Sequence, residues 1–337
     1  MNLQEINSLP LLPKLHNECL SSLQTTKNLL AFSGGIDSSA LFFLLLEANI
    51  TFDVAIVNYN TRTQSVEEVS FAQTLCTTYG KKCFIHSCKL DSANFEHHAR
   101  NVRYSFFEKI ITKHHYTTHL TAHHLNDRLE WFLMQLGKGA GLVEMLGMRE
   151  FEPKQNYTLV RPLLHVSKAS LLSFLQKNEM HYFIDESNET LSYLRNKIRK
   201  HHATPLIEAY GEGICKSFAY LEEDAKRLLS THTKRIKDLF IINKDSDNLI
   251  NIRQIDKAIK LLGTLISHET REEILRTKNC VVGGKIAVCF GEEFVFVAPF
   301  KEAIMDKKFK ELCRTQKIPP KIRPYIYEAQ IDINALR

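Results

Sequence analysis

The stretch Asn28-Leu29-Leu30-Ala31-Phe32-Ser33-Gly34-Gly35-Ile36-Asp37-Ser38 joins a short, mostly apolar run to a segment of helical spacing. This order is typical of a buried strand that turns into a helix. Two glycines let the backbone turn tightly and approach a ligand closely. The N–H groups and dipole of a helix N-terminus favour an anion. The loop therefore predicts a phosphate site, although a plain Gly-Gly turn capped by Asp37 or Ser38 would give the same residues.

The residues around this loop predict the fold. Runs typical of buried strands span residues 28–32, 52–58, 82–86 and 119–122. Segments with helical spacing span residues 38–48, 65–79, 95–114 and 127–136. Strands that alternate with helices predict an α/β fold, a doubly wound, Rossmann-like parallel sheet. In such sheets ligands bind beyond the carboxyl ends of the strands, so the chemistry is expected after residues 32, 58, 86 and 122.

The strand pattern fades after residue 163. Helical spacing predicts helices over residues 168–177, 193–201, 217–240 and 255–267. Residues 243–251 are mostly polar and read as a linker, and residues 280–299 combine glycines with β-branched and aromatic residues, which predicts hairpins. We therefore expect three parts: a catalytic domain over 1–213, a helical domain over 214–275, and a small C-terminal α+β hairpin segment over 276–337.

Composition excludes several classes of protein. The chain has 337 residues, 44% of them hydrophobic and 24% charged, as in a globular protein of two or three domains. No apolar run approaches the roughly 20 residues of a membrane span, and the first residues do not read as a secretory signal. The eight cysteines include no C-x-x-C pair, which argues against zinc ribbons and iron–sulfur sites. We expect a cytoplasmic protein with reduced thiols and no membrane partner.

A second group of polar residues follows the run at 119–122. His123, Asp127 and Glu130 stand at i, i+4 and i+7 and would share one helix face. A histidine with two carboxylates can hold Mg²⁺, transfer protons, or bind an ammonium group. Asn126 is a candidate helix cap. The plain alternative is a solvated helix start, where acidic residues offset the dipole.

Several motifs carry a family resemblance. Residues 33–38 resemble the SGGxDS pyrophosphate loop of the N-type ATP pyrophosphatases, which cleave ATP to AMP and pyrophosphate. Residues 122–148 resemble the segment AHHxxDQxExxLxxLxRGxGLxGLxGM of bacterial tRNA(Ile)-lysidine synthetases. Further family motifs are matched, in the family's order, at residues 96–104, 161–164, 185–199 and, more weakly, 317–323. Three places depart from the pattern: Tyr59-Asn60 replaces a His-Gly, Asn126 and Arg128 replace the first Asp and the Gln of an Asp-Asp-Gln run, and Thr190 replaces an Asp that usually follows Ser-Asn.

The resemblance implies an adenine nucleotide alpha hydrolase-like fold and a ligase. Members of the family use ATP to adenylate O2 of the wobble cytidine, position 34, in the CAU anticodon of tRNA(Ile). The ε-amine of L-lysine then attacks C2 and expels AMP. The product, lysidine, switches codon specificity from AUG to AUA. The resemblance thus implies ATP, Mg²⁺, lysine and tRNA(Ile) as ligands.

The same resemblance assigns roles to residues. The expected catalytic residues are Asp37, Asp127, His123 and Glu130, with Asp37 and Asp127 as the magnesium ligands. The expected ATP-binding residues are Ser33, Gly34, Gly35, Ile36, Asp37, Ser38, Arg100 and Arg103. The expected tRNA-binding residues are Arg195, Asn196, Lys197, Arg199 and Lys200.

The positive charge of the chain favours an RNA partner because it is concentrated in two segments. The net charge is +6, which is modest. Residues 194–202 hold four Lys/Arg and no acid, and residues 301–324 hold eight Lys/Arg against three acids. We expect both segments to contact tRNA. Two alternatives stay open, another tRNA-modifying pyrophosphatase such as a thiolase and a non-catalytic tRNA-binding relative; the oligomeric state, a homodimer included, is also open.

Overall fold

The computed structural model describes residues 13, 15–60, 64–89, 95–184, 194–228 and 232–336. They divide into two compact units, Met1–Leu221 and Glu222–Arg337. This differs from the three parts that we expected, with boundaries at residues 213 and 275. No separate helical domain forms over 214–275: the helices over 248–261 and 268–277 pack on the C-terminal sheet, and the helix over 204–228 contains the boundary between the two units.

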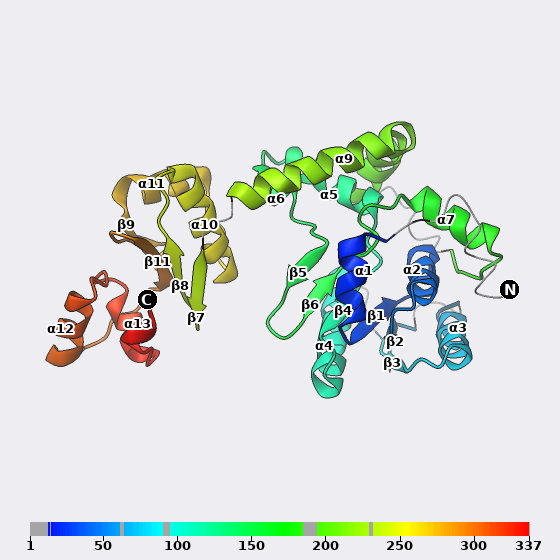
Figure 1. Ribbon diagram of the computed structural model, residues 1–337, viewed down its shortest axis with the longest axis horizontal. Helices are drawn as coiled ribbons and strands as arrows, with labels where there is room; N and C mark the ends of the chain where they lie inside the picture. The colour runs from blue at the N-terminus through cyan, green and yellow to red at the C-terminus, as the bar shows by residue number, and fades with distance from the viewer. Residues whose placement is uncertain are drawn as a thin grey trace. The chain divides into compact units, whose positions relative to one another are not determined.

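The first unit is built on a six-stranded sheet (Figure 1). Its strands are β1 (Asn28–Phe32), β2 (Phe52–Asn58), β3 (Cys83–Ser87), β4 (Thr118–Leu120), β5 (Phe151–Pro153) and β6 (Thr158–Val160). The order is β3-β2-β1-β4-β6-β5, parallel except for β5, which runs antiparallel to β6. The predicted doubly wound parallel sheet is therefore confirmed.

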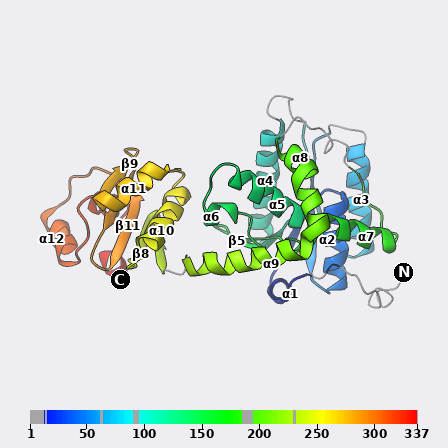
Figure 2. The ribbon, with the colours of Figure 1, turned by 90° about the horizontal axis from the view of Figure 1, so that it is seen from above.

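Helices connect these strands and cover both faces of the sheet. They are α1 (Asn17–Gln24), α2 (Ile36–Glu47), α3 (Gln64–Thr78), α4 (Phe95–His114), α5 (Leu125–Leu136), α6 (Leu142–Met145), α7 (Lys168–Lys177), α8 (Leu194–Ile198), the π-helical turn η3 (Arg199–Ala203) and α9 (Thr204–Leu228). Figures 1 and 2 both place α2 beside α3 and α7.

Alternate residues of each strand pack into two hydrophobic cores, one on each face of the sheet. Leu30 and Val54 pack with α1, α2, α3 and α7 on one face, whereas Leu29 and Ala55 pack with Phe107 of α4 on the other. Because both faces are buried, the strands are apolar throughout rather than alternating, as in parallel sheets generally. Burial of both faces therefore explains the continuous apolar runs in the sequence.

Strand order reverses between β1 and β4. From β1 the chain proceeds outward to β2 and β3, then returns to the other side of β1 to add β4. The loops after β1 and β4 therefore open a crevice at the carboxyl edge of the sheet, where α/β proteins of this kind bind ligands. The two polar groups singled out in the sequence, residues 33–38 and 123–130, follow these two strands.

The second unit is an antiparallel sheet between two layers of helices. Its strands are β7 (Thr233–Ile236), β8 (Leu239–Asn243), β9 (Asn279–Val282), β10 (Ile286–Phe290) and β11 (Phe294–Pro299), in the order β7-β8-β11-β10-β9. One face packs against α10 (Asn248–Leu261) and α11 (His268–Thr277). The other face packs against α12 (Lys307–Thr315), α13 (Arg323–Glu328) and the turn η4 (Ile333–Leu336).

Two local expectations fail in this region, and a third is confirmed. The helix expected over residues 217–240 ends at Leu228, and β7 and β8 follow it. The linker expected over 243–251 contains the start of α10, which Asp247 caps by accepting from the Leu249 N–H. The hairpins expected over 280–299 are present as β9, β10 and β11. Among the described helices, none combines the length and the apolarity that crossing a bilayer requires.

Candidate active site

The loop after β1 adopts the turn that its glycines predict. Gly34 has φ +77°, a left-handed conformation, and a Cβ there would lie 3.2 Å from Cδ2 of Phe183. Ser38 Oγ lies 3.2 Å from the Ser33 backbone nitrogen and accepts its hydrogen bond. Gly35 is the N-cap of α2 and offers no side-chain cap, so no protein side chain covers the first N–H groups of that helix from this position. The loop is thus a turn with backbone donors available to an anion.

Phe183 braces this loop from a distant part of the sequence. Its N–H donates to the Gly34 carbonyl at 2.9 Å, and Gly35 forms an isolated parallel bridge with it. Ser39 Oγ donates to the same carbonyl at 3.2 Å.

The junction of β4 and α5 presents the second polar group. His124 is the N-cap of α5 and forms a capping box with Asp127: its Nδ1 accepts from the Asp127 N–H, and Asp127 Oδ2 accepts from the His124 N–H. The expectation that Asn126 caps this helix is wrong. Asn126 Oδ1 instead accepts from the Lys168 N–H at 3.0 Å and secures the start of α7.

His124 joins the two loops electrostatically. Its Nε2 lies 3.5 Å from Asp37 Oδ2 and 3.4 Å from Asp127 Oδ2. Burial alone would lower the pKa of His124, but the carboxylates of Asp127 and Asp37 outweigh it and raise that pKa. Burial would likewise raise the pKa of Asp127, yet His124, His123 and Arg195 hold it down to about 2. Asp127 is therefore ionised at neutral pH.

Two arginines close over the carboxylates of α5. Arg195 donates through Nη2 to Asp127 Oδ1 at 2.6 Å and through Nε to Glu130 Oε2 at 2.8 Å. Arg199 donates through Nε to Glu130 Oε1 at 2.6 Å. Glu130 is fully buried. A buried carboxylate is tolerated only when it is paired in this way, so α8 and η3 are fastened to α5 by charge.

A cavity of about 440 Å³ lies between the loop after β1 and the junction of β4 and α5. The loop lines it with Ser33, Gly35, Asp37 and Ser38, and the β4 side lines it with Thr121, His123 and Asp127. Arg100 and Arg103 of α4 line it as well, and both are exposed. Tyr59, which stands where the family motif has His, also lines the cavity and donates its hydroxyl to the Ala99 carbonyl at 2.8 Å. The volume of this cavity and the charged side chains that line it suit a polar ligand.

Two buried histidines form the inner wall. Burial, reinforced by the nearby positive charge of Arg103, lowers the pKa of His119 to about 3. Burial also lowers the pKa of His123 to about 4, against the opposing effect of Asp127. His123 Nδ1 lies 2.9 Å from Thr121 Oγ1. Both rings are neutral near pH 7, so His123 can act there as a proton acceptor.

With this geometry in place, comparison with known proteins identifies the family. Residues 11–205 match the model of the PP-loop domain. The chain is 45% identical over 325 residues to the tRNA(Ile)-lysidine synthase of Campylobacter jejuni, covering 96% of this chain and 99% of that one. The chain belongs to the tRNA(Ile)-lysidine synthase family. A Wolinella succinogenes member is 43% identical over 92% of this chain and 95% of its own.

A solved structure supports the fold of this lysidine synthase family member. The U34-tRNA thiolase NcsA of Methanococcus maripaludis superposes with a TM-score of 0.50 at 16% identity, covering 66% of this chain and 77% of that one. At this identity the likeness concerns the fold alone. The PP-loop sheet is therefore shared with a protein of different sequence.

The PP-loop fold brings most of the predicted residues together. Four of the six loop residues meet Arg100, Arg103, His123 and Asp127 at one cavity, whereas Gly34 and Ile36 do not line it. Glu130 does not line it, because its carboxylate is saturated by Arg195 and Arg199. His123 precedes α5 rather than lying on it, so the shared helix face that we expected does not exist. The matched motif at residues 185–188 lies outside the described residues.

The predicted tRNA-binding set is divided by the structure. Arg195 and Arg199 turn toward the carboxylates of α5, whereas Lys197 and Lys200 are exposed. Asn196 is intermediate in exposure.

Sequence reasoning missed His124, which bridges Asp37 and Asp127. The sequence spacing could have indicated this role, because a polar residue three positions before an Asp at a helix start can form a capping box.

Proposed function

We propose that this protein ligates L-lysine to C2 of the wobble cytidine of tRNA(Ile) with the CAU anticodon, at the expense of ATP. The observation that carries the proposal is that a backbone loop suited to phosphates and the cluster of Asp37, His124 and Asp127 meet at one sheet edge, beside one cavity. This arrangement supports adenylation followed by nucleophilic displacement. The family relationship supports the identity of the nucleic acid.

In this proposal the loop binds the triphosphate of ATP. The amides at the start of α2 contact its oxygens, and the helix dipole adds favourable potential. Arg100 and Arg103 approach from α4, where a guanidinium can contact a phosphate through two parallel hydrogen bonds. The cytidine O2 attacks the α-phosphorus, and the bond to the bridging oxygen breaks as pyrophosphate leaves.

Magnesium is part of the proposal through Asp37. Asp37 Oδ1 is buried and has no hydrogen-bond partner among the described residues, which fits a carboxylate that awaits a cation. Asp127 is the second candidate ligand, and its two oxygens bond Arg195 and His124 here. Bound Mg²⁺ would offset the charge that develops on the leaving pyrophosphate.

The second chemical step needs a neutral amine. Lysine in water is protonated at neutral pH, so its ε-ammonium must lose a proton before it attacks. In this proposal the carboxylate of Asp127 attracts the ammonium, and the neutral ring of His123, which lines the same cavity, accepts the proton. The amine nitrogen then bonds to C2, the C2–O2 bond breaks, and AMP departs with the oxygen.

We assign tRNA contact to exposed cations outside the cavity. Lys197 of α8 and Lys200 of η3 are exposed, and both lie on the segment whose arginines bond Asp127 and Glu130. Residues 307–310, at the start of α12, add the exposed Lys307, Lys308 and Lys310 in the second unit. A cytoplasmic location follows from a tRNA substrate. Light scattering of the purified protein tests whether it forms a homodimer.

One assay tests the function directly. Purified protein is incubated with radiolabelled lysine, ATP, Mg²⁺ and a tRNA(Ile) transcript that carries C34, alongside a transcript with U34. We expect lysine incorporation and release of AMP and pyrophosphate with C34 only. Sulfur incorporation instead would indicate a thiolase, and tRNA binding without turnover would indicate a non-catalytic relative; either result would overturn the proposal.

A further inference from the structure

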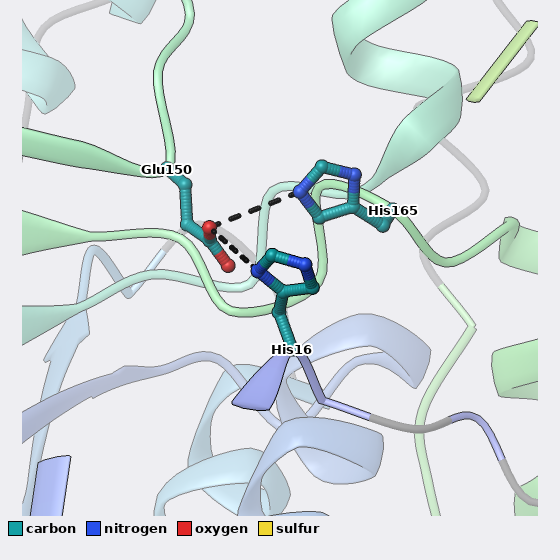
Figure 3. A group of neighbouring side chains, drawn as sticks. All are labelled: His16, Glu150 and His165. Atoms are coloured by element: carbon teal, nitrogen blue, oxygen red, sulfur yellow. Dashed lines mark ion pairs between the residues drawn. The ribbon is translucent and has the colours of Figure 1, made fainter. Parts of the chain in front are cut away.

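A group of three potential metal ligands lies outside the active-site cavity. His16 precedes α1, Glu150 precedes β5, and His165 follows β6, so residues far apart in the sequence converge at one point. Figure 3 shows the Glu150 carboxylate facing both imidazole rings, with one oxygen joined to each of them by a dashed line. The ligand atoms of the three side chains all lie within 4.8 Å of one another. Neither the loop at residues 33–38 nor the Asp37–His124–Asp127 cluster uses any of them.

The spacing is close to that of a coordination site. Glu150 Oε2 lies 3.6 Å from His16 Nδ1 and 3.8 Å from His165 Nε2. Ligands held at about 2.1 Å around a tetrahedral zinc ion are separated by roughly 3.4 Å. A shift of a few tenths of an ångström would therefore close the site around an ion.

Glu150 carries an unsatisfied atom at this point. Its Oε1 is buried and has no hydrogen-bond partner among the described residues, and its side chain is 12% exposed. A buried carboxylate oxygen without a partner costs free energy, and an ion would remove that cost. The backbone of Glu150 is already fixed, because its carbonyl accepts from the Arg161 N–H at 2.9 Å.

Cys215 orients one of the two histidines. Its Sγ lies 3.6 Å from His165 Nδ1 and 3.9 Å from the His165 carbonyl oxygen. A thiol that donates to the carbonyl can accept from Nδ1–H, and this tautomer leaves a lone pair on Nε2, on the side of Glu150. Histidine ligands of metal ions are commonly oriented by such a second contact. His165 and Cys215 also line an open cavity of about 950 Å³, which gives an ion a route from solvent.

We propose that His16, Glu150 and His165 form a binding site for a divalent transition-metal ion, with Zn²⁺ as the best match. Two imidazole nitrogens and one carboxylate oxygen are borderline ligands that suit zinc, whereas Mg²⁺ prefers oxygen ligands alone. The side chain of His16 is 55% exposed, which leaves room for water at the fourth position. The site is distinct in ligand chemistry from the magnesium that accompanies ATP.

The ion has a structural consequence for the first unit. It fastens α1 to the loop that follows β6. The same loop carries Val166, whose carbonyl accepts from the Leu125 N–H at 2.9 Å where α5 begins. A metal at this place therefore supports the segment on which His124 and Asp127 stand, without contacting them.

Zinc binding by the purified, untagged full-length protein tests the proposal. After treatment with a chelator, the protein is titrated with Zn²⁺ against a chromophoric competitor, and bound metal is counted by mass spectrometry. We expect one Zn²⁺ per chain, no competition from millimolar Mg²⁺, and a rise in Tm on zinc addition. His16→Ala and Glu150→Gln should weaken binding more than about 100-fold, and Cys215→Ala about 10-fold.

His268→Ala is the matched control, because His268 also pairs with a glutamate, at 3.6 Å, but on the exposed surface of α11. It should bind zinc like the wild type. Circular dichroism verifies that each variant is folded, and His16 lies at a half-exposed position where truncation is tolerated. The proposal is overturned if the wild type takes up no zinc, or if folded His16→Ala binds it as tightly as the wild type. An intense thiolate band on Co²⁺ substitution would overturn the ligand set, since it would place a cysteine on the metal.

Discussion

Asp127 shows how one side chain is shaped by its surroundings. It is buried, yet His124 on one side and Arg195 on the other keep it ionised. Its position in the first turn of α5 adds the favourable end of a helix dipole. In the proposed function, this fixed negative charge attracts the ammonium group of lysine or Mg²⁺.

Replacement of this charge is the most direct test of the cavity. Asp127→Asn keeps the size of the side chain and removes its charge, so we expect lysine incorporation to be abolished while the fold is retained. Incorporation by the radiolabel assay and far-ultraviolet circular dichroism measure the two effects. Asp306→Asn, which changes the N-cap of α12, is the control and should retain activity. Near-wild-type turnover by Asp127→Asn would remove it from the site.

His119 makes the first unit sensitive to acid. It is buried, and burial lowers its pKa from 6.5 to about 3, with smaller contributions in the same direction from Arg103, His123 and Arg161. Because the folded pKa is depressed, the unfolded chain binds the proton first as pH falls. The associated stability is complete above pH 6.5 and is lost progressively down to about pH 3.

This gives a prediction for His119→Leu, which places an apolar side chain among Phe107 and Tyr157. Between pH 7.5 and pH 5 the wild type should lose about 2 kcal/mol more stability than the variant. Urea unfolding at the two pH values measures the difference. His268→Leu, at an exposed position, should keep the wild-type pH dependence. An equal loss in wild type and His119→Leu would contradict the assignment.

At the scale of elements, the attachment of α8 and η3 to α5 depends on charge rather than on apolar packing. Glu130 is fully buried and pairs with both Arg195 and Arg199. The residues of α8 are exposed or intermediate, with none buried. These helices are therefore expected to be sensitive to any change in the ion pairs beneath them.

Arg199→Met tests that attachment. It preserves an apolar stem but leaves Glu130 with one partner, so we expect a loss of about 2–4 kcal/mol of stability. Adding Glu130→Gln removes the stranded charge and should recover part of the loss, which a double-mutant cycle by denaturant unfolding measures. The control Arg227→Met breaks an exposed pair with Glu223 and should cost less than about 0.5 kcal/mol. A cost of that size for Arg199→Met would show that the buried pair contributes little.

At the scale of the whole molecule, the basic excess is uneven. Of the eight Lys/Arg of residues 301–324, several are engaged within the second unit: Lys317 with Glu292, Arg314 with Glu311, and Lys321 with the Asn279 carbonyl. Lys307 and Lys308, at the start of α12, are exposed. Exposed positive charges such as these are available to bind a polyanion.

Replacement of these lysines should change the salt dependence of tRNA binding. For Lys307→Ala with Lys308→Ala, we expect weaker binding and a decrease of about 2 in the slope of log K against log salt. Filter binding at several salt concentrations measures both. The pair Lys109→Ala and Lys113→Ala, on α4, removes the same charge elsewhere and should leave the slope unchanged. Equal slopes for wild type and the α12 variant would remove this surface from the tRNA site.

Local sequence determined much of this protein. Apolar runs of strand length alternating with helical spacing gave the parallel sheet, because a sheet buried on both faces leaves a continuous apolar record. The glycines at 34 and 35 predicted the turn after β1, and Gly34 adopts φ +77°, which few other residues do. The motif order gave the family, and the cavity gathers most of the residues that these motifs named.

Tertiary structure decided what sequence spacing could not. Arg195 lies 65 positions from Glu130, so nothing local distinguishes a cation that grips RNA from one that neutralises a buried carboxylate. The boundary of the second unit was missed because β7 and β8 follow an amphipathic helix without a break in polarity. His16, Glu150 and His165 likewise share no motif. Coulomb attraction and burial act across space, and only the folded chain fixes which charges become neighbours.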